Sequence, residues 1–280
     1  MTVYFNGDFV AKEDVSISPD DRGFVFGDGV YEVVRAEDGA FFRLDAHRER
    51  LRRSLSEIRL LDAVDLDAVW DAVQGLLPRN DLTTGDAKVY LQITRGAAPR
   101  QHAFPASPVE PTIYARAEAI TLPTEKWAQG VSVILRPDQR WARCDIKSLN
   151  YLPNVLANQA AMEAGAYEAL LTREGFVTEG THSSMAAVVD GTVVTRPLTN
   201  HVLPSITRQV LLELCADQEI PTMERPIAVD ELSDADELLL LGTTTGIMPI
   251  VQVEDEAVDD GTPGPVVREL QDAFRALTPA

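Results

Sequence analysis

Alternation of apolar and polar residues in the first half of the chain predicts short strands joined by tight turns. Residues 3–10 alternate in this way and turn at Asn6-Gly7-Asp8, a combination typical of a β-hairpin. A second pair of strands is expected over residues 29–36 and 40–44, with Glu37-Asp38-Gly39 as the turn between them. Two further strands are expected over residues 88–95 and 111–117.

Apolar residues at helical spacing predict the helices, and most of these segments follow a residue that can cap a helix N-terminus. The expected helices span about 45–58, capped by Asp45; from Asp65 or Asp67 to residue 77, ended by Pro78; 154–164; 206–217, capped by Ser205; and about 264–277.

The second half is expected to contain shorter strands, at 131–136, 168–172, 188–190, 192–195 and 237–242. Asp190-Gly191 favours a hairpin turn between two of them. Strands and helices are mixed without a regular βα alternation, so the pattern favours an α+β fold over a doubly wound one. The composition changes at 120–125, which predicts a linker between a small N-terminal α+β domain, 1–119, and a larger C-terminal domain, 126–280.

The charge of the chain is strongly acidic. Its 280 residues hold 25 Lys and Arg against 44 Asp and Glu, a formal net charge of −19. This balance argues against nucleic acid and anionic membranes as partners. We favour a solvated acidic coat that keeps the protein soluble. The alternative is a surface adapted to high salt, which a melting series in increasing KCl would reveal as a gain in stability.

No apolar run is long enough to span a bilayer, and the first residues do not resemble a signal peptide. Cys144 and Cys215 are too few for a disulfide framework or a zinc site, so no metal is expected. A cytoplasmic enzyme is the natural interpretation.

Two charged residues, Lys147 and Glu179, fit the needs of a Schiff-base enzyme. Such an enzyme requires a lysine amine that loses its proton, because only the neutral amine attacks an aldehyde. If the aldehyde is pyridoxal phosphate, an acid must also face the ring nitrogen and keep it protonated. Each residue alone also has an ordinary interpretation. Lys147 could be a solvated surface lysine, and Glu179, beside Gly180, could be a turn residue.

Two segments could bind the phosphate of such a cofactor. Ser205-Ile206-Thr207 opens a helix, whose free N–H groups and dipole attract anions. The run 242–246, Gly-Thr-Thr-Thr-Gly, follows an apolar strand and offers hydroxyl and backbone donors. Arg50 could add a charge. An ordinary helix cap and an ordinary loop remain the alternatives, and no nucleotide-binding glycine motif is present.

Arg100 and His102 could bind a substrate carboxylate. They lie two positions apart in a loop rich in Pro, so an extended backbone points both side chains to one side. A solvent-facing basic loop is the alternative. Tyr31 follows three glycines in the stretch 21–32, and its side chain is either a core aromatic or a hydroxyl aimed into a pocket.

Taken together, these residues resemble the fold-type IV pyridoxal-phosphate enzymes, the class IV aminotransferases, and within them the bacterial D-amino acid aminotransferases. The resemblance implies a small N-terminal α/β sandwich domain and a larger C-terminal pseudo-barrel domain. The matching blocks are 21–34, 47–51, 94–105, 141–150, 178–180, 206–208 and 243–249.

The resemblance also implies a role for each matching residue. Lys147 would be the Schiff-base lysine and proton shuttle, and Glu179 would pair with the pyridine nitrogen of pyridoxal 5'-phosphate. Arg50, Ile206, Thr207 and Thr243 would hold the phosphate, and Leu203 would pack near the ring. Tyr31, Arg100 and His102 would bind the substrate carboxylate, with the Arg and His supplied by the neighbouring subunit of an obligate homodimer.

The implied reaction is ping-pong transfer of an amino group from a D-amino acid, such as D-alanine or D-glutamate, to a 2-oxo acid, such as 2-oxoglutarate or pyruvate. Branched-chain L-amino acid transfer, R-amine transfer and aminodeoxychorismate lyase chemistry are alternatives on the same fold, and a non-enzymatic binding protein is a third class. Arg100-Gln101-His102 matches the D-amino acid enzymes. The chain departs from that pattern at Thr181-His182-Ser183-Ser184, where a run of Ser ending in Asn is the closer match, and at Gly246, which replaces a longer polar side chain.

Overall fold

The computed structural model describes residues 1–277, and the chain divides into two compact units. The first unit holds residues 1–121 together with 146–150, and the second holds 122–145 and the described chain from 151 onward. The segment 146–150, which carries Lys147, therefore belongs to the first unit although it follows part of the second. The domain bounds expected from composition, 1–119 and 126–280, stay a prediction.

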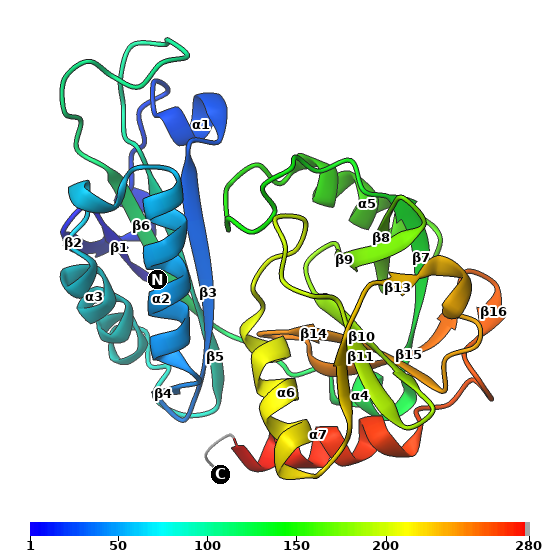
Figure 1. Ribbon diagram of the computed structural model, residues 1–280. Coiled ribbons are helices and arrows are strands. Elements are labelled where there is room, and N and C mark those ends of the chain that lie inside the picture. Colours follow the sequence, from blue (N-terminus) through cyan, green and yellow to red (C-terminus); the bar gives the residue numbers. More distant parts are fainter. Residues whose placement is uncertain (278–280) are drawn as a thin grey trace. The chain divides into compact units, whose positions relative to one another are not determined.

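The first unit is built on a six-stranded antiparallel sheet with the order β2-β1-β6-β5-β3-β4 (Figure 1). The predicted hairpin at Asn6-Gly7 is confirmed, and both turn residues have the positive φ angles, 47° and 106°, that a tight hairpin turn of this type needs. The strands are β1 (Thr2–Phe5), β2 (Asp8–Ala11), β3 (Gly29–Glu37), β4 (Ala40–Phe41), β5 (Asp86–Thr94) and β6 (Thr112–Ala119).

Two long helices, α2 (Leu44–Glu57) and α3 (Leu66–Arg79), pack their apolar sides on this sheet and bury Leu51, Leu55 and Trp70. Asp65 caps α3 as expected, because its side chain accepts the N–H of Ala68 at 3.1 Å. The unit also contains α1 (Arg22–Phe26), which the sequence analysis missed, and the short 3₁₀ turns Lys12–Asp14 and Leu61–Ala63.

Among the helix boundaries that differ from the prediction, two concern a residue expected to start or stop a helix. Arg43, with φ 52°, holds the N-cap position of α2, and the expected cap Asp45 lies inside the first turn. An acidic residue there still interacts favourably with the helix dipole, which explains its presence without a cap bond. Pro78 does not end α3, since the helix continues through it to Arg79.

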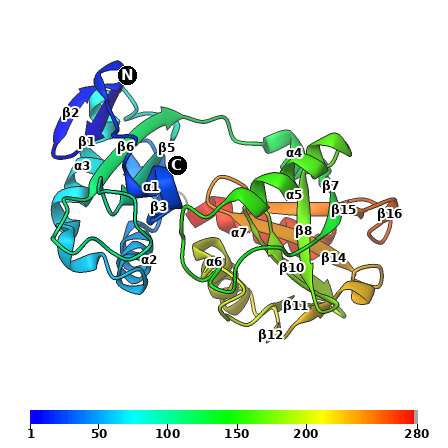
Figure 2. The same ribbon diagram turned by 90° about the horizontal axis from the view of Figure 1, so that it is seen from above.

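The second unit is built on a ten-stranded sheet, β12-β11-β10-β14-β15-β7-β8-β9-β13, with β16 paired to β15. The sheet curls strongly, as Figures 1 and 2 show. β7 and β8 are parallel and joined through α5, whereas most other neighbours are antiparallel. The strands are β7 (Val131–Pro137), β8 (Glu168–Arg173), β9 (Phe176–Gly180), β10 (Ser184–Val189), β11 (Thr192–Thr195), β12 (Thr222–Glu224), β13 (Ile227–Ala228), β14 (Glu237–Gly242), β15 (Gly246–Val253) and β16 (Glu256–Ala257).

The helices of the second unit cover this sheet. α6 (Ile206–Asp217) and α7 (Pro265–Leu277) pack against each other and against β14, whereas α5 (Leu152–Glu163) packs on β7 and β8 (Figure 2). The expected cap of α6 is confirmed, because Ser205 Oγ accepts the N–H of Arg208 at 3.2 Å. The short helix α4 (Thr124–Gln129) and the 3₁₀ turn Val229–Glu231 complete the unit.

β15 is a buried strand that the sequence analysis did not predict. Pro249 lies in its middle, and a proline normally argues against an interior strand because it donates no ladder hydrogen bond. In this strand Pro249 is tolerated, since pairing with β7 begins only at the next residue, Ile250.

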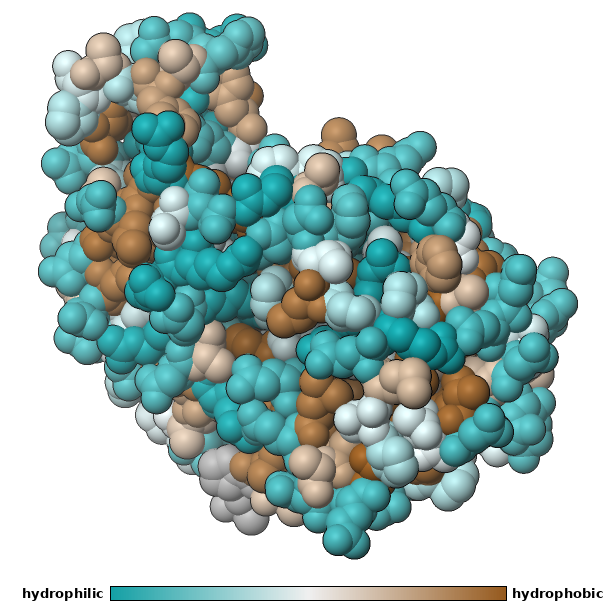
Figure 3. Space-filling view, viewed as in Figure 1, coloured by the Kyte–Doolittle hydropathy of each residue, from teal (hydrophilic) through white to brown (hydrophobic). Residues whose placement is uncertain are grey.

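Hydrophilic side chains cover most of the surface seen in Figure 3, and hydrophobic ones form small separate groups. This distribution suits the hydrophilic coat that we favour, and adaptation to high salt stays the untested alternative.

Candidate active site

Lys147 lies in an extended segment that pairs with the beginning of β3. The N–H of Tyr31 donates to Lys147 O at 3.0 Å, and that of Leu149 donates to Gly29 O at 3.1 Å. The N–H of Lys147 donates to Ser54 Oγ on α2 at 3.3 Å. The neighbouring Ile146 is buried in the core of the first unit. These contacts fix the backbone on both sides of the lysine, so its side chain begins from a well-defined point.

The amine of Lys147 lies against an aromatic ring. Nζ is 4.3 Å from the ring centroid of Tyr31, and the Tyr31 ring stacks on Tyr90 with centroids 5.8 Å apart. Lys147 is only half-buried. The structure thus brings together two of the predicted site residues, the lysine and Tyr31.

Arg50 is held by a buried carboxylate that the sequence analysis did not single out. Its Nε and NH2 donate to the two oxygens of Glu32 at 2.7 and 2.8 Å, and His47 Nδ1 lies 2.9 Å from Glu32 Oε2. Glu32 is 0% exposed and Arg50 8% exposed. Burial alone would raise the pKa of Glu32, but the guanidinium of Arg50, helped by His47, holds it well below its usual range.

His47 completes this buried group as a neutral donor. Burial lowers its pKa by more than the Glu32 carboxylate raises it. A neutral imidazole with its proton on Nδ1 donates to Glu32, and this bond orients the carboxylate toward Arg50. Glu32 and His47 therefore determine where the Arg50 guanidinium lies.

Arg100 and His102 both lie against the ring of Phe26. Arg100 Cζ is 5.2 Å from the ring centroid, and the His102 and Phe26 rings meet edge to face at 5.9 Å. Arg22 anchors the loop between them, because its NH1 donates to Gln101 O at 2.8 Å. Both side chains therefore contact the same ring. Both residues are exposed on the single chain.

In the second unit, Glu179 lies near the end of β9 and is 5% exposed. Its Oε2 accepts the N–H of Leu203 at 3.1 Å, and its Oε1 accepts from Arg140 NH1. Arg140 is itself held by Asp138, with bonds of 2.9 and 2.8 Å to the two carboxylate oxygens. Burial raises the pKa of Glu179 even against the nearby Arg140 charge.

The predicted phosphate-binding residues of this unit lie at the N-terminus of α6 and in the turn after β14. Ile206 and Thr207 occupy the first turn of α6, where backbone N–H groups have no partner within the helix. Thr243 follows β14, against which α6 packs. Helix N–H groups and threonine hydroxyls are donors suited to a phosphate.

His182 lies beside a second buried carboxylate that the sequence analysis missed. Glu168 is fully buried and accepts from the backbone N–H of His182 at 2.8 Å and from Ser183 Oγ at 2.9 Å. The Nδ1 of His182 lies 3.3 Å from Glu168 Oε1. The segment 181–184, where the chain departs from the family pattern, thus has its backbone anchored to Glu168.

The donor set fits pyridoxal phosphate. In the first unit, Lys147 offers an amine suited to an aldehyde. In the second unit, taken by itself, Glu179 is a buried carboxylate suited to a ring nitrogen, and the α6 N-terminus offers phosphate donors. Glu32, Glu168 and Arg140 were missed as supporting residues. A carboxylate directly beside apolar strand residues is the signal that could have identified both: Glu32 precedes Val33 and Val34, and Glu168 begins β8 before Ala169 and Leu170.

Among residues 1–277, no helix is long and apolar enough to cross a membrane. The same described residues contain no cluster of His, Cys, Asp or Glu suited to a metal ion.

Comparison with known proteins identifies the family. Residues 29–253 match the family described as amino-transferase class IV. A D-alanine aminotransferase of Staphylococcus epidermidis is 43% identical over 272 residues, covering 97% of this chain and 96% of its own. The D-alanine aminotransferase of Bacillus licheniformis is 38% identical, covering 98% and 96%.

Solved structures show the same fold. The branched-chain amino acid aminotransferase of Escherichia coli matches with a TM-score of 0.91 at 26% identity, covering 99% of this chain and 94% of its own. A T.th. branched-chain amino acid aminotransferase, solved with pyridoxamine 5'-phosphate, matches with a TM-score of 0.87 at 25% identity, covering 99% and 94%. These likenesses confirm the predicted fold class.

Proposed function

Because the chain belongs to the class IV aminotransferases, we propose that it transfers the amino group of a D-amino acid to a 2-oxo acid with the help of pyridoxal 5'-phosphate. Relatives named D-alanine aminotransferase, similar over nearly the whole chain, support this substrate class. The structural observation that supports the choice is that Arg100 and His102 lie against one ring, Phe26, since a guanidinium and an imidazole side by side suit a carboxylate.

The residues have the following roles in this proposal. Lys147 binds the aldehyde, and Glu179 pairs with the ring nitrogen. Arg50, Ile206, Thr207 and Thr243 hold the phosphate, and Leu203, whose N–H anchors Glu179, packs near the ring. When bound, pyridoxal phosphate supplies an electron sink for the charge left when the substrate loses its α-proton.

The chain's own residues handle the proton. A neutral Lys147 amine would take the proton from the substrate α-carbon and would pass it to the carbon of the cofactor that keeps the amino group. Only a neutral amine accepts this proton. The half-buried position of Lys147 over the Tyr31 ring restricts the positions that Nζ can reach. Glu32 and His47 keep the Arg50 guanidinium in place for the phosphate.

We further propose a homodimer. Arg100 and His102 are exposed on the single chain, which suits residues that complete the site of a neighbouring subunit. Tyr31 would share the carboxylate with them. A location in the cytoplasm stays a prediction from the sequence.

A parallel substrate assay tests the substrate class. D-alanine, L-leucine and R-1-phenylethylamine are each supplied with 2-oxoglutarate, and formation of the keto product is followed. We expect D-alanine to react fastest. A preference for L-leucine would support the second candidate, a branched-chain aminotransferase, which the likeness to the Escherichia coli enzyme favours.

A further inference from the structure

The turn that carries Thr243 is a three-residue hairpin loop. Gly242 ends β14 and pairs with Gly246, which begins β15 and has a φ of 65°. A left-handed residue after a three-residue loop is a known way to close such a hairpin. Within the loop, Thr245 is buried. The shape of the loop therefore determines where the donors of Thr243 point.

Trp127 of α4 supports this loop from outside. Its Nε1 donates to Thr245 O at 2.6 Å. A Cβ added to Gly246 would lie only 3.0 Å from Cζ2 of the same indole, tighter than ordinary contact. The indole thus bonds to one residue of the loop and packs against the next. Gly246, where the sequence departs from the family pattern, leaves the space that the tryptophan fills.

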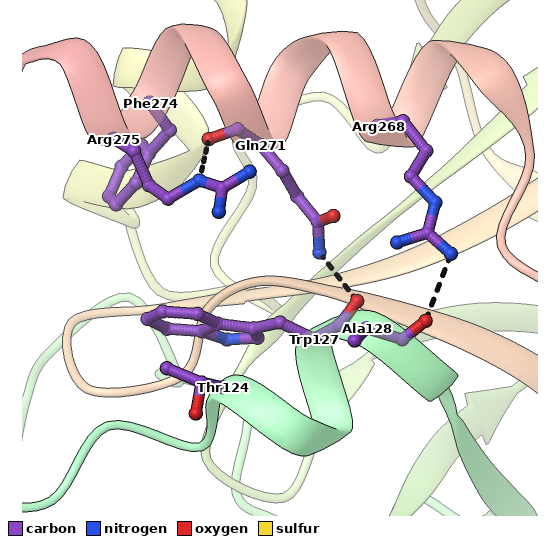
Figure 4. A pocket seen from close by; sticks show the side chains of 7 residues that line it. All are labelled: Thr124, Trp127, Ala128, Arg268, Gln271, Phe274 and Arg275. Atoms are coloured by element: carbon purple, nitrogen blue, oxygen red, sulfur yellow. Dashed lines mark hydrogen bonds between the residues drawn. The ribbon is translucent and has the colours of Figure 1, made fainter.

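Gln271 of α7 supports Trp127 and the strand beyond it. Its Nε2 donates to Trp127 O at 3.1 Å and to Ile247 O at 2.9 Å. The side chain is 8% exposed. Figure 4 shows Gln271 pointing from α7 toward the backbone of Trp127, whose ring lies flat between the two helices. The two side chains thereby hold carbonyl groups on both sides of Gly246.

These residues line a cavity of about 130 Å³ between α4 and α7. Its polar side chains bond to their own neighbours: Arg268 donates to Ala128 O at 2.9 Å, and Arg275 pairs with Asp272. The apolar surface of the cavity comes mainly from Trp127 and Phe274 (Figure 4). This arrangement favours a structural support for the loop over a separate ligand site.

We propose that Trp127 and Gln271 are positioning residues that hold the Thr243 loop in the conformation that binds the cofactor phosphate. This inference rests on the proposed function. Both side chains bond to backbone carbonyl groups, Trp127 to Thr245 O and Gln271 to Trp127 O and Ile247 O. Each acts through backbone carbonyl groups of the loop and its following strand, so their effect falls on the phosphate and not on the pyridine ring.

The test compares binding of pyridoxal phosphate and of pyridoxal, which lacks the phosphate. Both dissociation constants are measured by the visible absorbance of the bound compound in wild type, Trp127→Phe and Gln271→Met. Trp127→Phe keeps an aromatic ring and removes the donor to Thr245 O. Trp70→Phe is the matched control, because Trp70 Nε1 has no hydrogen-bond partner among the described residues.

We expect both variants to bind pyridoxal phosphate about fivefold to tenfold more weakly, the usual effect of one or two lost hydrogen bonds, with pyridoxal affinity unchanged. Trp70→Phe should leave both affinities unchanged. Melting of the cofactor-free proteins identifies variants that do not fold, and Gln271→Met then carries the test if Trp127→Phe fails.

Equal losses for the two compounds, or no loss for either, would overturn the inference. A wild-type protein that bound neither compound would overturn the proposed function itself, and the positioning role with it. The wild-type measurement therefore separates the two failures.

Discussion

Replacement of Glu32 by glutamine tests the buried group that holds Arg50. Glu32 is 0% exposed and accepts both bonds of the Arg50 guanidinium. Glutamine keeps the shape of the side chain but removes the charge and turns one acceptor into a donor facing Arg50. Breaking a buried pair from one side leaves an uncompensated charge, which costs about 3 kcal/mol in the free energy of unfolding.

The pH dependence gives this prediction a second readout. The pKa of Glu32 in the folded protein lies well below its ordinary value of 4.5, so its stabilisation is complete above pH 4.5. It is lost progressively as the pH falls from there toward the folded-state pKa. We therefore expect the difference between wild type and Glu32→Gln to be constant near neutral pH and to shrink below pH 4.5.

Urea unfolding of the cofactor-free proteins, repeated from neutral to acid pH, measures both effects. Glu49→Gln is the control. Glu49 pairs with Arg52 on the exposed side of α2, the helix that carries Arg50, so its replacement should leave the free energy of unfolding unchanged. A Glu32→Gln protein as stable as Glu49→Gln, or a difference that does not shrink in acid, would refute the role given to this buried carboxylate.

Three further changes have defined outcomes. Lys147→Ala should abolish the visible absorbance of the bound cofactor and nearly all turnover, and an active, yellow variant would contradict the assignment of this lysine. Arg100→Ala should raise the KM for D-alanine by about tenfold or more, because it removes a charged contact with the substrate carboxylate. The dissociation constant of pyridoxal phosphate should stay unchanged; steady-state kinetics measures the first quantity and titration the second. Ser205→Ala should lower the free energy of unfolding by about 1 kcal/mol in a urea titration, because it removes the side-chain acceptor for Arg208 N–H; an unchanged midpoint would argue against the cap.

Local rules predicted much of the fold. Asn6-Gly7, Asp65 and Ser205 lie where turn and cap chemistry places them, because each acts on backbone groups only a few residues away. Pro249 shows where such rules fail, since whether a proline is tolerated depends on which neighbouring strand pairs beside it. Residues 146–150 belong to the first unit because of contacts with residues far away in the sequence, and local rules could not predict this.

The chemistry of the candidate site stays a prediction, and the buried residues that support it were missed. Lys147 and Glu179 stood out because few reactions need those groups together. Glu32 was hidden inside a strand pattern, and its partner Arg50 lies on a helix 18 residues away. The distance between such residues in the sequence says nothing of their contact in space. Trp127 was equally hidden, in the short helix α4, which follows the expected linker and was not predicted.

The central claim is transfer of an amino group from a D-amino acid. It is tested most directly by incubating the wild-type protein with racemic alanine, 2-oxoglutarate and pyridoxal phosphate and then measuring both alanine enantiomers by chiral chromatography. The account predicts that D-alanine falls and D-glutamate forms while L-alanine stays constant. Loss of L-alanine, or no transfer from either enantiomer, would contradict it.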